Sequence, residues 1–342
     1  MFQTIIDLYD VFRTDVDIGE EFEDDDTAVD TDPAHYLSRD GFYLRQTTKF
    51  RRTAMGIINA IFQAIIQGLT EFLPVSSSGH LSLYQHFTGN SGEGALFFSA
   101  ILHLGTLVAV FVAFRKTIWD MIKELGVMIK DIFTGKFTLK NMNPPRRMIV
   151  MIIVSCFCLV PFLPFKGWFE GIAEDSSIFA EGLCFLYTSA ILFMSDRCVK
   201  GKKTQGDIAY KDAITVGLFQ GVALLPGVSR SGSTISAGLF SGMTRETSVK
   251  YSFILGIPVI LMSCLLEVKD AVSTRADIDW VSCAVGFVVA AFVGLCAIKL
   301  VNWLVKTDKF KVFAYYTLVL GVIVLVISFI EMCMGHPISF AK

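Results

Sequence analysis

The sequence predicts an all-α protein that crosses a membrane several times, because of its composition, its long apolar runs and two polar interruptions within apolar segments. Of the 342 residues, 53% are hydrophobic and 18% are charged, and the mean hydropathy is +0.56. These values are typical of integral membrane proteins. The eight cysteines form no CxxC pair and lie mostly in apolar runs, where they act as small apolar residues rather than as disulfide or zinc ligands. We therefore expect membrane lipids around the protein and no nucleic-acid partner.

The N-terminal part of the chain differs from the rest in charge. Residues 1–54 carry 13 Asp or Glu and six Lys or Arg, whereas the rest of the chain carries 19 and 24. The acidic run at 20–26 is typical of a solvated or disordered tail. We expect a disordered acidic extension over residues 1–54 and a membrane domain over residues 55–342. Met55 would be the functional start, or the tail a dispensable extension.

Six apolar runs are long enough to cross a membrane, which takes about 20 residues per helix. They lie at about 96–114, 147–165, 179–195, 248–266, 281–301 and 312–333.

Two further apolar segments are broken, at about 55–95 and 208–243. Pro74 interrupts the first, and Pro226 with Gly227 interrupts the second. Neither arm of a broken segment is long enough to span a bilayer comfortably, and proline ends a continuous helix. We therefore predict two re-entrant helix–loop–helix segments.

Lysine and arginine residues indicate which loops lie in the cytoplasm. The loop from Arg115 to Arg147 contains eight, whereas the loop at 166–178 contains only Lys166. The first is therefore predicted to be cytoplasmic and the second external, and the C-terminus external. With this orientation the two broken segments enter from opposite faces of the membrane.

The two broken segments also resemble each other in sequence. Gln-Gly begins both, at Gln67 and Gln220, and Val-Ser-x-Ser-Gly ends both, at 75–79 and 228–232. Each segment is followed by three predicted spans, so the halves at about 55–195 and 208–333 form an inverted-topology repeat. Folds of this kind place their site near the midplane, where the broken helices meet.

The two broken segments bring together ionisable and hydroxyl groups, which are costly at membrane depth and indicate a functional site. The candidates are Gln67, Glu71, Ser76, Ser77, Ser78, His80, Ser229, Arg230, Ser231, Ser233 and Thr234.

Their chemistry suits a phosphate ligand. Arg230, among hydroxyls and backbone N–H groups freed by glycine, can hold a phosphate with its forked guanidinium. Glu71 could bind a divalent cation or act as an acid or base. His80 near a serine could activate a nucleophile or protonate a leaving group. Other readings stay open. The small residues could serve close packing, and His80 could be a satisfied interior histidine. Arg230 could be a structural partner of Glu71, and Gln67 and His103 could simply bridge helices.

Two motifs resemble a known family. Gln67-x-x-x-Glu71, followed by Phe-Leu-Pro-Val-Ser-Ser-Ser-Gly-His80, and the stretch from Pro226 to Thr234, Pro-Gly-Val-Ser-Arg-Ser-Gly-Ser-Thr, are similar to motifs of the undecaprenyl-diphosphate phosphatases, or bacitracin-resistance proteins. The resemblance covers about residues 55–335. It implies hydrolysis of the terminal phosphate of undecaprenyl diphosphate, which recycles the lipid carrier of cell-wall synthesis in the bacterial inner (plasma) membrane.

The resemblance also implies roles for individual residues. Family members need a divalent cation, usually Mg2+ or Ca2+, and Glu71 matches the motif glutamate expected to bind it. Gln67 stands where the family often has a second glutamate, so that carboxylate is missing here. Ser77, His80 and Arg230 match residues that the family is thought to use in chemistry.

From these matches we expect Glu71, Ser77, His80 and Arg230 to be catalytic. The expected substrate-binding residues are Gln67, Ser76, Ser78, Ser229, Ser231 and Thr234. The nucleophile stays open between Ser77, His80 and water, and His80 serves as base or acid. A homodimer stays open as well.

A second function is compatible with the same sequence. Inverted repeats with broken helices are typical of transporters, so a polyprenyl-phosphate transporter or flippase is the alternative to a phosphatase. A carrier would need the arginine and the backbone N–H groups but not a histidine beside a run of serines. The combination of Glu71, Ser77, His80 and Arg230 therefore favours an enzyme.

Overall fold

The computed structural model describes residues 56–89, 95–173, 177–198, 200–274, 279–307 and 309–338. The acidic extension predicted over residues 1–54 lies outside the described residues. Within the described ranges the secondary structure is helical, apart from one isolated β-bridge between Lys203 and Met243. This agrees with the predicted all-α class.

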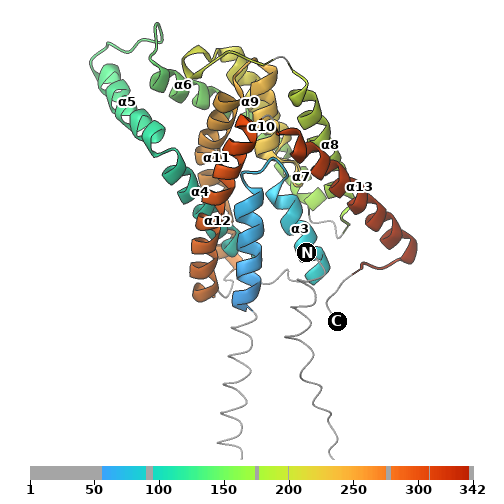
Figure 1. The fold of residues 1–342 in the computed structure, drawn as a ribbon. Helices are drawn as coiled ribbons and strands as arrows, with labels where there is room; N and C mark the ends of the chain where they lie inside the picture. Colours follow the sequence, from blue (N-terminus) through green and yellow to red (C-terminus); the bar gives the residue numbers. More distant parts are fainter. Residues whose placement is uncertain are drawn as a thin grey trace, which may run out of the picture. The chain divides into compact units, whose positions relative to one another are not determined.

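Most of the helices are joined by short connections (Figure 1). They are an unlabelled first helix Gly56–Thr70, then α3 (Ser77–Thr88), α4 (Ala95–Ala113), α5 (Arg115–Phe133), α6 (Pro144–Phe157), the 3-10 helix η1 (Val160–Phe165), α7 (Lys166–Ala173), α8 (Phe179–Asp196), the 3-10 helix η2 (Gln205–Asp207), α9 (Tyr210–Val222), α10 (Arg230–Phe240), α11 (Arg245–Thr274), α12 (Trp280–Lys306) and α13 (Lys311–Met334).

Four helical stretches in the described part of the chain are long and apolar enough to cross a membrane: Pro144–Phe162, Arg245–Lys269, Trp280–Lys306 and Lys311–Met334. A fifth is present if α4 and α5, bent by 87° at their junction, count as one span. The predicted run 179–195 corresponds to α8, which is not among these stretches. The chain is thus a multi-pass helical protein. The six full spans that were predicted outnumber the four or five that the described residues contain.

Large apolar side chains point outward along the long helices. Phe292 on α12 is 70% exposed and Phe329 on α13 is 61% exposed. Soluble monomers rarely expose extended apolar surfaces of this kind, whereas lipid tails cover them without cost. The exposed side chains therefore support a membrane location independently of helix length.

Helix α5 was not expected, because the charge pattern predicted a loop at 115–147. Its charged residues alternate with apolar ones at helical spacing, and Ile118 and Met128 are buried on its apolar side. Arg146 at the start of α6 fixes it by ion pairs to Glu124 (2.6 Å) and Asp131 (2.7 Å). A helix with one charged and one apolar face is typical of a segment that lies at a membrane surface.

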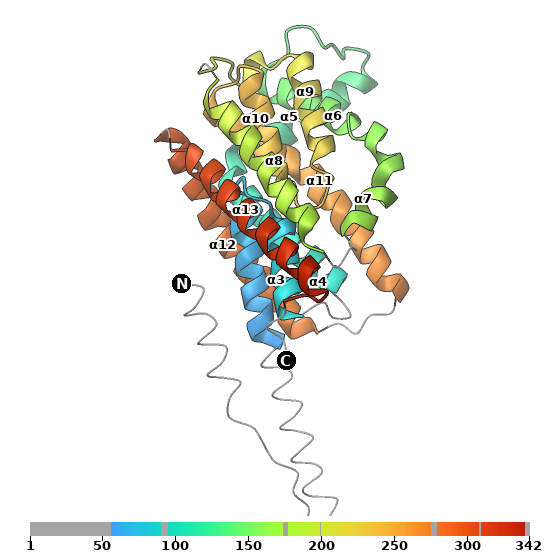
Figure 2. The same ribbon diagram turned by 90° about the vertical axis from the view of Figure 1, so that its right-hand side faces the viewer.

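The helices that follow the two broken segments pack across the two halves of the chain. Helix α4 packs against α11 and α12, and α8 packs against α13, as both views show (Figures 1 and 2). The first helix, Gly56–Thr70, begins at one end of the unit formed by residues 53–342, and α9 and α10 lie toward the opposite end of that unit. The two broken segments therefore approach each other from opposite ends.

The first break is fixed in the main hydrophobic core. Phe72 and Val75 are almost fully buried there, and the ring of Phe72 packs edge-on against Phe253 of α11, with 5.3 Å between centroids. Burying a phenylalanine side chain contributes about 1.5–3 kcal/mol. This anchor holds the neighbouring Glu71 beside α11.

Candidate active site

The first break is a turn between Gly56–Thr70 and α3. Ser76 has a positive φ of 74°, a conformation that costs a residue with a side chain about 1–3 kcal/mol. The Ser76 hydroxyl accepts a hydrogen bond from the N–H of Gly79 (3.1 Å) and so caps α3. The positive φ of Ser76 and the cap together direct the chain from the turn into α3.

The second break also contains a residue with a positive φ, but here that residue is a glycine. Gly227 carries the positive φ, 93°, and a side chain there would also crowd Cys184 of α8. Ser229 then caps α10 by accepting from the N–H of Gly232 (3.0 Å), at the same spacing as in the first break. Because glycine tolerates the turn conformation, this break needs no strained serine.

The two turns are in direct contact. The N–H of Gly227 donates to Ser78 Oγ (3.1 Å), and Ser231 Oγ donates to the carbonyl of Leu73 (3.1 Å). Residues about 150 positions apart in the sequence therefore form one junction, as predicted for a site made from both broken segments.

Glu71 lies at the centre of this junction and is only 6% exposed. Arg230 Nη2 donates to its Oε1 in a short ion pair, while Ser77 Oγ (2.8 Å) and Gln67 Nε2 (3.0 Å) donate to its Oε2. Three of the four residues predicted to be catalytic thus meet at one carboxylate, and Gln67 joins them.

The buried atoms that have no hydrogen-bond partner in the described part of the chain include Arg230 Nη1 and Gln67 Oε1 at the junction. Buried polar groups are usually paired, so unpaired ones call for an explanation. Nη1 lies against Gly256 of α11, where an added Cβ would stand only 2.2 Å away. Gly256 could not be singled out from the sequence, because the close approach joins two distant helices.

On the side of α4 and α11, the junction continues into a second group. His103 Nε2 lies 3.9 Å from Glu71 Oε2, and His103 Nδ1 lies 3.9 Å from Glu267 Oε2. The sequence suggested His103 as a helix bridge, and this position fits that role. Glu267 was missed, although a carboxylate in an apolar helix is a signal that could have found it.

Among the described residues, no hydrogen bond or ion pair joins His80 to Glu71, Ser77 or Arg230. Its Nδ1 lies 2.6 Å from the carbonyl oxygen of Ser76, and its Nε2 lies 2.7 Å from the hydroxyl of Tyr316 on α13. Both ring nitrogens are thus engaged away from Ser77 and Glu71.

The remaining predicted binding residues support the junction. Thr234 bonds to Ser252 of α11 (2.6 Å) and to the carbonyl of Arg230 (2.9 Å). Ser76 and Ser229 are caps, and Ser78 and Ser231 join the two turns. The structure therefore brings these five residues close to the junction and uses their hydroxyls within the protein.

The junction offers oxygen donors for a divalent cation, but its described residues do not supply a complete set of ligands. Among the described residues, no group of three His, Cys, Asp or Glu side chains could hold a metal ion. The carboxylate of Glu71 and the unpaired Gln67 Oε1 are hard oxygen donors. Mg2+ is commonly bound by one or two carboxylates together with substrate phosphates, so these two residues fit such an ion.

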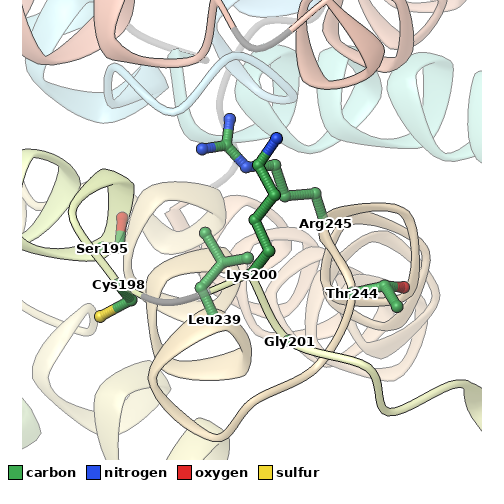
Figure 3. Close-up of a pocket in the computed structure, with 7 residues that line it drawn as sticks. All are labelled: Ser195, Cys198, Lys200, Gly201, Leu239, Thr244 and Arg245. Atoms are coloured by element: carbon green, nitrogen blue, oxygen red, sulfur yellow. The ribbon is translucent and has the colours of Figure 1, made fainter.

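A pocket of about 210 Å³ lies away from the junction, where the ends of α8 and α10 meet the start of α11 (Figure 3). It is lined by Ser195, Cys198, Lys200, Gly201, Leu239, Thr244 and Arg245. None of the predicted site residues lines it. We therefore place the candidate site at the buried ion pair of Glu71 and Arg230 with its neighbouring hydroxyls, and not at this pocket.

Known proteins resemble the chain over the whole junction. A family model described as "Bacitracin resistance protein BacA" matches residues 60–323. An undecaprenyl-diphosphatase of Alkaliphilus metalliredigens is 39% identical over 276 residues, which are 80% of this chain and 99% of the relative. An undecaprenyl-diphosphatase of Methanosphaera stadtmanae is 37% identical over 278 residues, 80% of this chain and 99% of the relative. Undecaprenyl-diphosphatase 4 of Bacillus thuringiensis subsp. konkukian is 37% identical over 278 residues, 81% and 99% of the two chains.

Proposed function

We propose that this chain, which belongs to the bacitracin resistance protein BacA family, is a phosphatase that hydrolyses undecaprenyl diphosphate to undecaprenyl phosphate and inorganic phosphate. The family resemblance predicted from the two motifs is confirmed. The observation that carries the function is the junction of the two breaks, where Arg230, Ser77 and Glu71 meet. A guanidinium, a hydroxyl and a carboxylate are the groups that phosphoryl transfer needs for charge neutralisation, attack and proton removal.

Arg230 binds the diphosphate in this proposal. Its Nη2 is held by Glu71, while its Nη1 has no partner among the described residues and can donate to a phosphate oxygen. The N-termini of α3 and α10 begin at the same junction, so their dipoles add positive potential for an anion. Arginine is suited to the task because its fork matches two phosphate oxygens.

Ser77 is the proposed nucleophile and Glu71 its base. The Ser77 hydroxyl already donates to Glu71 Oε2 at 2.8 Å, which is the contact expected of a nucleophile and its activating base. Attack forms a bond between Ser77 Oγ and the terminal phosphorus, breaks the bond to the lipid-phosphate oxygen and passes the serine proton to Glu71. Water then attacks the phosphoserine, Ser77 Oγ leaves with the proton held by Glu71, and inorganic phosphate is released. The contact at Ser77 favours Glu71 over His80 as the group that takes the serine proton. His80 is the proposed base for the second step, in which it takes one proton from the attacking water.

Mg2+, with Ca2+ as the alternative, is the proposed cofactor. Glu71 and Gln67 would hold it, since they supply the oxygen donors of the junction. When bound, the ion would neutralise negative charge on the phosphate oxygens. With glutamine in place of a second glutamate, the substrate's own oxygens would have to complete its coordination.

The membrane arrangement that we propose has six full spans and two re-entrant segments in an inverted repeat, within a bacterial plasma membrane. Two features support it: the matching caps at Ser76 and Ser229, and the approach of the two breaks from opposite ends (Figures 1 and 2). The site would open toward the outer face, where the lipid diphosphate would be hydrolysed. Cysteine accessibility in intact cells, at positions on the predicted cytoplasmic and external loops, tests this orientation.

Phosphate release by the purified protein in detergent tests the function. The expected result is release from undecaprenyl diphosphate that stops with EDTA and returns with Mg2+. A protein that moves the lipid between vesicle leaflets but releases no phosphate would contradict the proposal and support the transporter alternative.

A further inference from the structure

The imidazole of His80 has both of its nitrogens in short hydrogen bonds, and these bonds fix its protonation pattern. Nδ1 lies 2.6 Å from the carbonyl oxygen of Ser76, which can only accept a hydrogen bond. Nδ1 must therefore carry a proton. In the neutral ring, Nε2 is then the nitrogen without a proton, and it can only accept.

The group that donates to Nε2 is Tyr316. Its hydroxyl lies 2.7 Å from Nε2, and the two rings are nearly parallel, at 8° with 5.7 Å between centroids. Phe185 of α8 packs edge-on against the imidazole from another side, with 5.3 Å between centroids. The ring is thus held by α3, α8 and α13 together.

This arrangement has a consequence for the chemistry of His80. Because Nδ1 is committed to Ser76, only Nε2 can exchange a proton during a reaction. Because the hydroxyl of Tyr316 occupies the lone pair of Nε2, the position and the basicity of this nitrogen depend on that hydroxyl. Nothing in the sequence joins the two residues, which lie 236 positions apart.

We propose that Tyr316 is a positioning residue for phosphate release, which acts by holding His80 with Nε2 as its single proton-exchanging nitrogen. The inference rests on the proposed phosphatase function. It adds to the site a further element, α13, that supplies neither the nucleophile nor the phosphate-binding arginine.

Tyr315 provides a matched control. It is the neighbouring tyrosine on α13, it is 55% exposed compared with 47% for Tyr316, and its ring packs edge-on against Phe193 rather than on His80. Replacing either tyrosine by phenylalanine removes one hydroxyl and keeps the ring. Only the change at Tyr316 should affect the imidazole.

The experiment compares wild-type protein, Tyr316→Phe and Tyr315→Phe in detergent, with kcat and KM for phosphate release from undecaprenyl diphosphate. We expect Tyr316→Phe to lower kcat about tenfold, the effect of one lost hydrogen bond, with KM within about twofold of wild type. Tyr315→Phe should leave both constants within about twofold. Equal thermal unfolding midpoints for the three proteins would exclude loss of folded protein as the cause.

A spectroscopic measurement separates positioning from packing. In protein labelled with 15N-histidine, the Nε2 resonance of His80, assigned by its loss in His80→Gln, should move in Tyr316→Phe and stay in Tyr315→Phe. Unchanged kcat or an unchanged Nε2 resonance in Tyr316→Phe, with an active wild type, would overturn the inference alone. A wild type without phosphate release would overturn the proposed function and the inference with it.

Discussion

Replacing Arg230 by alanine should damage both the stability and the activity of this protein, for reasons that can be separated. Arg230 is the ion-pair partner of Glu71, and the side chain of Glu71 is only 5% exposed. Without Arg230, the buried carboxylate loses its cationic partner, and among the described residues it retains Ser77 and Gln67 as hydrogen-bond donors.

The size of the stability loss follows from this environment. Removing one partner of a buried ion pair costs about 3–5 kcal/mol in the free energy of unfolding. Arg230 is 17% exposed and Glu71 keeps two neutral donors, so we expect about 3 kcal/mol, the lower end of that range. The turnover rate should fall at least ~100-fold, as it does when one preorganised electrostatic group is lost.

The double substitution Arg230→Ala with Glu71→Gln distinguishes the two effects. The amide at position 71 removes the unpaired charge and can still accept from Ser77, so the free energy of unfolding should return to within about 1 kcal/mol of wild type. Phosphate release should stay as low as in the single mutant, because both the phosphate-binding cation and the base are gone.

The measurements are thermal unfolding in detergent and phosphate release at saturating substrate. Near-wild-type turnover by folded Arg230→Ala would show that the arginine is only a structural partner of Glu71. A double mutant as unstable as Arg230→Ala would show that the buried charge is not the source of the instability.

Three further changes act on other parts of the junction. Ser77→Ala should lower kcat for phosphate release at least ~100-fold, since the proposed nucleophile is lost. Gly256→Ala places a Cβ 2.2 Å from Arg230 Nη1 and should lower kcat/KM at least ~10-fold by displacing the guanidinium. Gln67→Glu adds a second carboxylate beside Glu71 and should lower the Mg2+ concentration for half-maximal activity about tenfold, as measured by Mg2+ titration.

Ser78→Ala is the control for Ser77→Ala, and Gly126→Ala is the control for Gly256→Ala. Ser78→Ala removes the acceptor for the N–H of Gly227, so it should cost about 1–3 kcal/mol of stability while turnover stays within about tenfold. Gly126→Ala on α5 meets nothing within 4 Å and should leave turnover unchanged. If Gly126→Ala were as inactive as Gly256→Ala, displacement of the guanidinium would not be the cause. An unchanged Mg2+ requirement in Gln67→Glu would argue against a cation at this position.

The broken helices could be predicted from the sequence because their causes are local. Pro74 and Gly227 impose turns, and Ser76 and Ser229 each cap the helix that follows. The pairing of Arg230 with Glu71 required one further step, the recognition that the two segments repeat. By contrast, α5 was missed because its charges were read as a loop signal, whereas its apolar residues recur at helical spacing.

The position of His80 could not be predicted from the sequence. His80 lies close to Ser77 in the sequence, and this suggested that the two act together. The ring instead turns toward Tyr316, because a contact between α3 and α13 decides its direction. A contact between distant segments also explains why Gly256 was not found.

The ion pair between Glu71 and Arg230 limits how the two halves of this chain can diverge in evolution. Although the two breaks share a sequence pattern, each holds one half of an indispensable pair of charges. Neither break can exchange its residue for the other's without leaving two like charges face to face. Once the copies had diverged in this way, neither half could form the ion pair with a second copy of itself, and the site requires both.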